Sequence, residues 1–197
     1  MSDFKIILGI TGPSGAGKSA LSSALARNFN AQVICADKIA REVIDEKVLS
    51  EIRAEFGRDV LENGELNRQK LGKIVFENAQ KREKLNAIIW PRVIKKIESE
   101  IAKSVKNTII IDVPMLFESG LDKICNKTIA VLADENLRLE RIMNRDKISQ
   151  TDAKRRMNAQ PNYDFYKSRA DFVIINDGDE NNLTKKFEEW YKSCKNL

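Results

Sequence analysis

The sequence contains no histidine and little cysteine. Its 197 residues include no histidine and three cysteines, Cys35, Cys125 and Cys194. Without histidine, neither a Ser-His-Asp triad nor a His-ligated zinc site can form, so a general base has to be a carboxylate or a less usual group. The cysteines are odd in number and widely spaced, which predicts neither a disulfide framework nor a metal motif. We expect them to be reduced thiols.

Long apolar runs are also missing. No run approaches the roughly 18 apolar residues that a membrane-spanning helix needs. The N-terminus lacks the apolar stretch and the small-residue cleavage site of a secretory signal. The sequence therefore predicts a cytoplasmic protein without a membrane partner. With 42% hydrophobic and 32% charged residues, the composition is typical of one globular domain that has room for an insertion.

The positive charge is concentrated in one segment. Between Arg138 and Arg169, nine Lys and Arg residues outnumber four Asp and Glu residues, which gives +5, and the whole chain is also +5. The remainder of the chain is therefore close to neutral. A concentrated patch favours a polyphosphate ligand over a long nucleic-acid track, so we expect no nucleic-acid partner.

The stretch GPSGAGKS at residues 12–19 fits the phosphate-loop motif G-x-x-x-x-G-K-[ST]. An apolar run at 5–10 precedes the motif, and an amphipathic helical pattern follows it. Glycines allow the tight turn that makes loop N–H groups converge on a phosphate at the helix N-terminus. Lys18 is expected to reach the β- and γ-phosphates of a nucleotide, and Ser19 to offer its hydroxyl to Mg²⁺.

Short apolar runs alternate with helical patterns along the chain. We predict strands at five runs, namely 5–10, 31–37, 107–114, 127–134 and 170–177. The alternation predicts a doubly wound α/β domain with a parallel sheet. Helical segments interrupt it at about 38–105 and 135–168, and both should lie at the carboxyl edge of the sheet around one site. Within the first, we expect a turn at 62–65 between helices and a new helix at Pro91.

Two carboxylates end predicted strands. Asp112 follows three isoleucines, and a carboxylate there lies near the phosphate loop, where it can bind Mg²⁺ directly or through water. Asp37 ends the second strand, where a kinase of this shape holds its acceptor, so it could take the proton of an acceptor hydroxyl. Arg41 follows one helical turn later and could hold a substrate phosphate. The structural alternatives are a strand-end cap for Asp112 and a helix N-cap for Asp37.

Arginines gather in the second helical segment. Arg138, Arg141 and Arg145 are spaced i, i+3 and i+7, so they share one helix face, and Arg156 follows after a short break. A mobile segment that carries them could close over a nucleotide, neutralise charge on the transferring phosphoryl group and exclude water. The alternative is a solvated basic face.

Six stretches, taken in order, resemble the dephospho-coenzyme A kinase family: TGPSGAGKS, ICADKIAREV, IIIDVPMLFESG, RLERIMNRD, RRMNAQ and ADFVIINDG. The resemblance implies transfer of a phosphoryl group from ATP to the ribose 3′-hydroxyl of dephospho-CoA, which gives CoA and ADP in the last step of CoA biosynthesis. It also implies a single domain of P-loop nucleoside-monophosphate-kinase-like fold, a three-layer sandwich with a five-stranded parallel sheet. Its parts would be a core (1–37, 106–134 and 169–197), a helical CoA-binding insertion (38–105) and a helical lid (135–168).

The resemblance further implies roles for individual residues. Asp37 matches the proposed base, and Lys18 and Arg141 complete the catalytic set. ATP would contact Gly12, Ser14, Gly15, Ala16, Gly17, Lys18, Ser19, Ala20, Arg141, Arg145, Asn176 and Gly178. Dephospho-CoA would contact Asp37, Arg41, Pro114, Leu116, Phe117, Glu118, Arg156 and Gln160. Mg²⁺ would bind at Ser19 and Asp112.

Three positions depart from the family pattern. Cys35 stands where members usually carry aspartate, Ala20 where they often carry threonine, and Trp90 where a histidine usually precedes Pro91. These departures bear on the acceptor pocket rather than on the reaction.

Two alternatives stay open, another small-molecule P-loop kinase (nucleoside, shikimate or gluconate type) and a nucleic-acid-binding ATPase. A GTP-dependent switch is disfavoured because Asn126-Lys127 lacks the aspartate of the guanine motif and precedes its strand. We expect a monomer.

Overall fold

The structure is a computed structural model that describes residues 5–176 and 178–194. It divides into two compact units. The core unit comprises Met1–Ile34 and Ser104–Leu197, and the insertion unit comprises Cys35–Lys103. The segment 135–168, for which we predicted a lid, belongs to the core unit.

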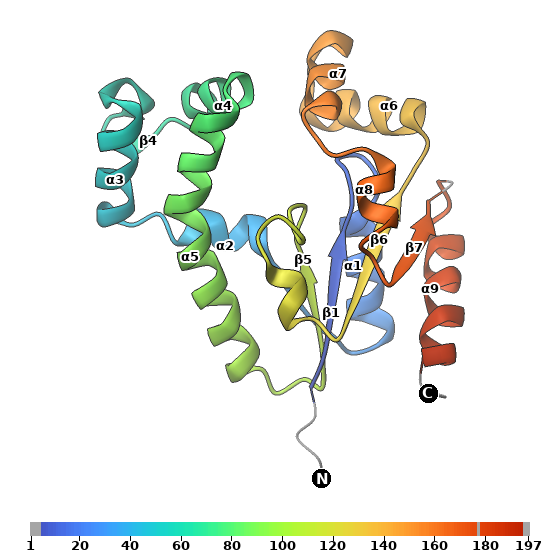
Figure 1. The fold of residues 1–197 in the computed structure, drawn as a ribbon. Coiled ribbons are helices and arrows are strands. Elements are labelled where there is room, and N and C mark those ends of the chain that lie inside the picture. Colours follow the sequence, from blue (N-terminus) through green and yellow to red (C-terminus); the bar gives the residue numbers. More distant parts are fainter. Residues whose placement is uncertain (1–4, 177, 195–197) are drawn as a thin grey trace. The chain divides into compact units, whose positions relative to one another are not determined.

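Within the described residues, a five-stranded sheet forms the centre of the core unit (Figure 1). Its strand order is β2-β5-β1-β6-β7, with β2 at Gln32–Cys35, β5 at Thr108–Asp112, β1 at Ile6–Thr11, β6 at Lys127–Leu132 and β7 at Phe172–Ile175. Strand β1 pairs in parallel with β5 and β6, and β6 pairs in parallel with β7. The predicted α/β fold is confirmed. Because Ile10 is in register with Asp112, the end of β5 lies beside the start of the phosphate loop.

Apolar side chains cover both faces of this sheet. Helices α1 (Lys18–Asn28) and α9 (Glu180–Cys194) pack on one face, where Leu21, Leu25 and Phe187 join the main hydrophobic cluster. On the other face, helix α8 (Tyr163–Lys167) buries Tyr166 against β6. The 3₁₀ helix η2 (Leu121–Ile124) precedes β6. Central strands buried on both faces explain their near-continuous Ile and Val composition.

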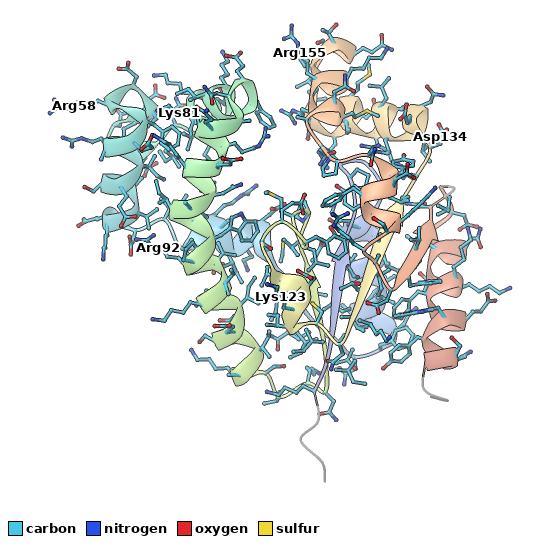
Figure 2. All side chains as sticks on the ribbon, viewed as in Figure 1. Arg58, Lys81, Arg92, Lys123, Asp134 and Arg155 are labelled. Atoms are coloured by element: carbon cyan, nitrogen blue, oxygen red, sulfur yellow. The ribbon has the colours of Figure 1, made fainter. Side chains whose placement is uncertain are left out.

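The arginine-rich helices begin at the carboxyl end of the sheet. Two residues separate the end of β6 from helix α6 (Glu135–Asp146), and the Asp134 side chain caps this helix by accepting from the N–H groups of Asn136 and Leu137. Asp134 is labelled at this junction in Figure 2. Helix α7 (Gln150–Asn158) is capped in the same way by Ser149. Side-chain caps at both starts fix where these helices leave the core.

The insertion unit is mostly helical. Its elements are α2 (Ala36–Glu42), α3 (Glu46–Phe56), η1 (Arg58–Val60), β3 (Leu61–Glu62), β4 (Glu65–Leu66), α4 (Arg68–Glu77) and α5 (Ala79–Lys103). It has its own hydrophobic cluster around Val48, Ile52, Val60 and Leu71. A cavity of about 260 Å³ lies within this unit and is lined mainly by apolar side chains, including Trp90.

Ion pairs fasten α3 to α5 inside the insertion unit. Glu51 accepts from Arg92 at 2.6 Å, and Glu55 pairs with Lys81 at 3.2 Å and Lys84 at 2.8 Å. Lys81 and Arg92 are labelled in Figure 2. Hydrogen bonds from Lys84 and Lys81 lower the pKa of Glu55 below its ordinary value. Because these side chains are partly exposed, we expect the pairs to contribute little net free energy of folding.

Two expectations for this unit were wrong. Pro91 does not begin a helix, because it lies inside the continuous helix α5. Ile89, before it, packs against the cluster of this unit, and Val93, after it, is fully buried, so burial on both sides holds the two halves in one helix. The turn at 62–65 joins the short strands β3 and β4 rather than two helices. Asn63 and Gly64 adopt positive φ there, as an Asn-Gly hairpin turn requires.

No helix among the described residues combines the length and the apolar character that crossing a bilayer would demand.

We predict that Phe187→Ala will lower the free energy of unfolding by about 3–5 kcal/mol. Phe187 is 1% exposed, and its ring packs against Phe29, Trp190 and Tyr191, so truncation leaves a cavity. The matched control is Phe76→Ala, because the Phe76 side chain is 56% exposed and should cost much less. Equilibrium urea unfolding measures both variants. Equal losses for the two would contradict the packing described here.

Candidate active site

The phosphate loop, residues 12–19, connects β1 to α1 at the carboxyl edge of the sheet. Neighbouring backbone comes so close that two of its glycines have no room for a side chain. A Cβ on Gly12 would overlap the carbonyl oxygen of Val131 on β6, and one on Gly15 would lie 2.7 Å from the carbonyl oxygen of Arg138 on α6. Both glycines also adopt positive φ, 137° and 79°. The loop is therefore fitted against both β6 and α6.

Three consecutive carbonyl groups of the loop accept hydrogen bonds from side chains outside it. The donors are Arg138 Nε to Ser14 O at 2.9 Å, Arg141 Nη1 to Gly15 O at 3.1 Å, and Asn176 Nδ2 to Ala16 O at 2.8 Å. Two donors come from α6 and the third follows β7. These bonds fix the direction in which each carbonyl points.

The orientation of these carbonyls decides where the loop N–H groups point. In a planar trans peptide, the N–H of the next residue points opposite to the C=O. Among the residues that the structure describes, the N–H groups of Gly15 and Gly17 have no acceptor, whereas that of Ala16 donates to Pro13 O at 3.2 Å. Unsatisfied N–H groups at the start of α1 form an anion-binding site.

Lys18 places its charge over the same loop. Its ammonium donates to Gly12 O at 2.7 Å and to Pro13 O at 3.3 Å. Ser19, the next residue, is exposed in the first turn of α1. The positive charge and the hydroxyl therefore accompany the N–H groups at one helix terminus, an arrangement that suits a polyphosphate.

Asp112 is the last residue of β5 and is 7% exposed. Its Oδ2 atom accepts a hydrogen bond of 3.0 Å from Ser22 Oγ on α1. Carboxylate and hydroxyl oxygens are hard donors of the type that Mg²⁺ prefers, so Asp112 and Ser19 fit this ion. Among the described residues, no group of three or more acidic or cysteine side chains could hold a metal. An Mg²⁺ ion here would therefore need phosphate oxygens and water as its other ligands.

Two further arginines share one carboxylate. Asp146 accepts from Arg145 Nε at 2.8 Å and from Arg156 Nη1 at 2.6 Å, and Arg145 also reaches Ser14 Oγ at 3.2 Å. The hydrogen bond from Arg145, with help from Arg156, lowers the pKa of Asp146 below its ordinary value. The predicted arginine face of α6 therefore contacts the phosphate loop with all three of its side chains.

The burial of Arg138 was not anticipated. Sequence spacing grouped it with Arg141 and Arg145, yet it is 4% exposed and lies behind the loop rather than on a solvated face. Gln160, for which we predicted an acceptor contact, places its Oε1 atom 2.8 Å from Ser14 N. The one sequence signal for the burial of Arg138 is that it lies close to the junction of the predicted strand and helix.

Two of the remaining residues that we predicted to contact ATP follow β7. Asn176 is 4% exposed, and its Oδ1 atom accepts from Gly178 N at 3.0 Å. Gly178 lies close to the Arg141 guanidinium. Residue 177 lies outside the described residues. Ala20, in the first turn of α1, is half-buried and packs against the main hydrophobic cluster.

The segment after β5 carries four residues predicted to contact the acceptor. Pro114 O accepts from Thr11 Oγ1 at 3.0 Å, which ties the segment to the end of β1. Leu116 is fully buried, whereas Phe117 is half-buried and packs edge-to-face with Phe165. Glu118 is exposed, and partial desolvation of its carboxyl raises its pKa above the ordinary value. The acceptor roles of these residues stay predictions.

Asp37 and Arg41 belong to the insertion unit. Strand β2 ends at Cys35, so the prediction that Asp37 ends a strand was wrong, and so was the N-cap alternative, because Cys35 occupies that position. Asp37 lies in the first turn of α2, where the helix dipole favours a negative charge. Both side chains are exposed, with no hydrogen-bond partner in the part of the chain that the structure describes. They are therefore available to a ligand.

Comparison with known proteins identifies close relatives. Residues 6–182 match the family model described as dephospho-CoA kinase. Dephospho-CoA kinase from Fusobacterium nucleatum is 42% identical over 187 residues, which cover 94% of this chain and 96% of that protein. These matches include the phosphate loop, the insertion unit and the arginine-rich helices.

Solved structures share the fold. A protein from Thermus thermophilus is 27% identical with a TM-score of 0.82, covering 96% of this chain and 98% of its own. Dephospho-CoA kinase from Campylobacter jejuni is 28% identical with a TM-score of 0.66, covering 97% and 98%. Shikimate kinase from Bacteroides thetaiotaomicron, 15% identical with a TM-score of 0.58 over 95% and 98% of the chains, is alike in fold alone.

We predict that Gly12→Ala will weaken ATP binding and lower turnover by about a hundredfold, the order expected when a reacting group moves by about 1 Å. The added Cβ would overlap Val131 O, so the loop backbone has to shift. Gly64→Ala is the matched control, because Gly64 also has positive φ but no atom within 4 Å of the added Cβ. Isothermal titration with ATP compares the two. Unchanged ATP affinity in Gly12→Ala would contradict the close fit of the loop against β6.

Proposed function

The chain belongs to the dephospho-CoA kinase family, and we propose that it transfers the γ-phosphoryl group of ATP to the ribose 3′-hydroxyl of dephospho-CoA. The products are CoA and ADP. The match of the family model over residues 6–182 carries this proposal, because one alignment includes the phosphate loop, the insertion unit and the arginine-rich helices. The geometry of the loop supports the nucleotide half of the reaction.

ATP binds through the phosphate loop. The N–H groups of Gly15 and Gly17 donate to phosphate oxygens, and Lys18 neutralises charge on the β- and γ-phosphates. Arg141 and Arg145 approach from α6, and Asn176 and Gly178 border the adenine. Phosphoryl transfer needs little covalent help from a protein, so positioning and charge stabilisation supply most of the catalysis.

Mg²⁺ fits the hard oxygen donors of Ser19 and Asp112. When bound, this ion supplies neutralisation of the charge that develops on the β- and γ-phosphate oxygens. The chain contributes the buried carboxylate and the hydroxyl that hold it, and Ser22 orients the carboxylate through its 3.0 Å hydrogen bond.

Dephospho-CoA presents its 3′-hydroxyl to Asp37. As the 3′-oxygen forms its bond to the γ-phosphorus, the bond from that phosphorus to the β,γ-bridging oxygen breaks, and ADP leaves with the electron pair. The Asp37 carboxylate takes the hydroxyl proton, a role that a chain without histidine gives to a carboxylate. Arg41 and Arg156 bind phosphate oxygens of the acceptor, and Gln160 and the segment Pro114–Glu118 border it. The helices of segment 135–168 act as the lid, and residues 38–105 bind the CoA portion.

A coupled assay of ADP release tests the proposal. The purified protein is given ATP and Mg²⁺ with dephospho-CoA, with shikimate, with gluconate, with nucleosides, or with no acceptor. We expect ADP release to depend on dephospho-CoA, and phosphorus NMR of the product to locate the new phosphate on the 3′-oxygen. Faster turnover with another acceptor, or stimulation by DNA without an acceptor, would assign the protein to one of the alternative classes.

We predict that Lys18→Ala and Arg141→Ala will each lower turnover at least as much as Asp37→Asn. An arginine at the transferring group contributes about 10³–10⁵ in rate, whereas a positioned base contributes about 10²–10⁴. Steady-state kinetics with both substrates measure the losses. The control is Lys192→Ala, which removes an exposed cation in the last turn of α9, outside the proposed binding segments. Wild-type turnover in Arg141→Ala would refute the lid assignment.

A further inference from the structure

We infer that Arg138 and Gln160 are positioning residues that together hold the backbone of Ser14 and so set the phosphate loop for ATP. This inference rests on the proposed function, because it takes ATP as the ligand of the loop. Neither side chain needs to touch the nucleotide. Both act through the two peptide units on either side of the Ser14 Cα atom.

The two side chains hold both peptide units that flank this atom. Arg138 Nε donates to Ser14 O at 2.9 Å, and Gln160 Oε1 accepts from Ser14 N at 2.8 Å. Arg138 Nη2 also donates to the same Gln160 oxygen at 3.5 Å. The N–H and the C=O of Ser14 are both hydrogen-bonded, and their two partners are hydrogen-bonded to each other. Arg138, Gln160 and Ser14 therefore form one closed hydrogen-bonded ring.

This ring controls the donors that a phosphate would meet. The Ser14 carbonyl belongs to the peptide that carries the Gly15 N–H, so fixing the carbonyl fixes the opposite direction of that N–H. The preceding peptide carries Pro13 O, which accepts from Lys18 Nζ at 3.3 Å. Through Ser14, the pair therefore sets one backbone donor directly and affects one anchor of the lysine.

Arg138 also contributes charge. It is 4% exposed, and its partners are neutral groups, since Nη1 donates to Tyr163 Oη at 3.3 Å and the guanidinium lies 5.5 Å from the Tyr163 ring centroid. Within the described ranges, no carboxylate forms an ion pair with it. The neutral dipoles around this buried charge stabilise it but do not cancel it. The charge therefore makes the electrostatic potential at the loop more positive, which favours a polyanionic ligand.

A purely structural role makes a different prediction. If the pair only fastens α6 and residue 160 to the core, its loss should lower the melting temperature and the active fraction, while the remaining enzyme keeps its ATP affinity. A cavity of about 780 Å³ lies beside the pair and is lined by Arg138, Gln160 and Tyr163 among others. Water from this cavity can occupy part of the space that a shorter side chain leaves, so we expect the variants to fold.

The test measures ATP affinity by titration without any acceptor, and then KM and kcat with dephospho-CoA. Loss of a hydrogen bond that involves a charged group changes an equilibrium constant by about ten- to a hundredfold. We expect Arg138→Gln to raise the Kd and the KM for ATP within this range. The KM for dephospho-CoA and kcat should change by less than about twofold, because the acceptor contacts remain. Arg138→Lys, which keeps the charge and one donor nitrogen, should recover part of the loss.

Gln160→Leu and the double variant test whether the two residues act as one unit. We expect Gln160→Leu to raise the Kd for ATP by about fivefold, the order for a neutral hydrogen bond. The double variant should lose less than the product of the single losses, because both residues act on Ser14. The matched control is Arg155→Gln on α7, whose side chain is 78% exposed and pairs with Asp152. Arg155 is labelled on α7 in Figure 2, and its variant should bind ATP as the wild type does.

Three outcomes would overturn the inference. They are an unchanged ATP affinity in Arg138→Gln with only a lower melting temperature, an effect equal to that of Arg155→Gln, or single losses that multiply independently in the double variant. If Arg138→Gln does not fold, the same measurements on Arg138→Lys and Gln160→Leu test the inference. Failure of the proposed function would look different, since the variants would still change ATP affinity while the wild type left dephospho-CoA unphosphorylated.

Discussion

A carbonyl oxygen that points at a phosphate repels it, so a phosphate loop works only when its carbonyls face elsewhere. In this protein the carbonyls of Ser14, Gly15 and Ala16 are held by side chains from outside the loop. Each bond fixes a peptide plane and thereby directs the following N–H the other way. The glycine-rich sequence permits this conformation, but the surrounding donors determine it. The neighbouring strands and helices have to place these donors beside the loop.

The order of the sheet brings the donors to the loop. Strand β6 lies next to β1 and leads into α6, which carries Arg138 and Arg141, and β7 lies next to β6 and leads to Asn176. Because parallel strands end at the same edge, three adjacent strands deliver the loop and its donors to one place. The Asp134 cap fixes the start of α6, so the arginines one and two turns later face the loop. A short side-chain cap thus determines the direction of long cationic side chains.

Residue spacing predicted the parts of this arrangement that depend on local pattern. The loop motif, the apolar strands and the i, i+3, i+7 arginines each follow from one short stretch of sequence. What the sequence could not give depends on contacts distant along the chain. Pro91 continues a helix because apolar residues on both sides of it are buried, and Arg138 is buried because α6 lies against the loop. Propensity and spacing carry no information about either contact.

The absence of histidine fits this chemistry. A loose phosphoryl-transfer transition state develops most of its charge on the equatorial and leaving oxygens, so proton removal from the acceptor is a smaller demand than charge stabilisation. A carboxylate can meet the smaller demand, while the larger one requires many fixed donors and cations. The chain concentrates its excess positive charge between Arg138 and Arg169, and three of those arginines contact the phosphate loop directly. These arginines therefore lie beside the loop, where phosphoryl transfer demands the most charge stabilisation.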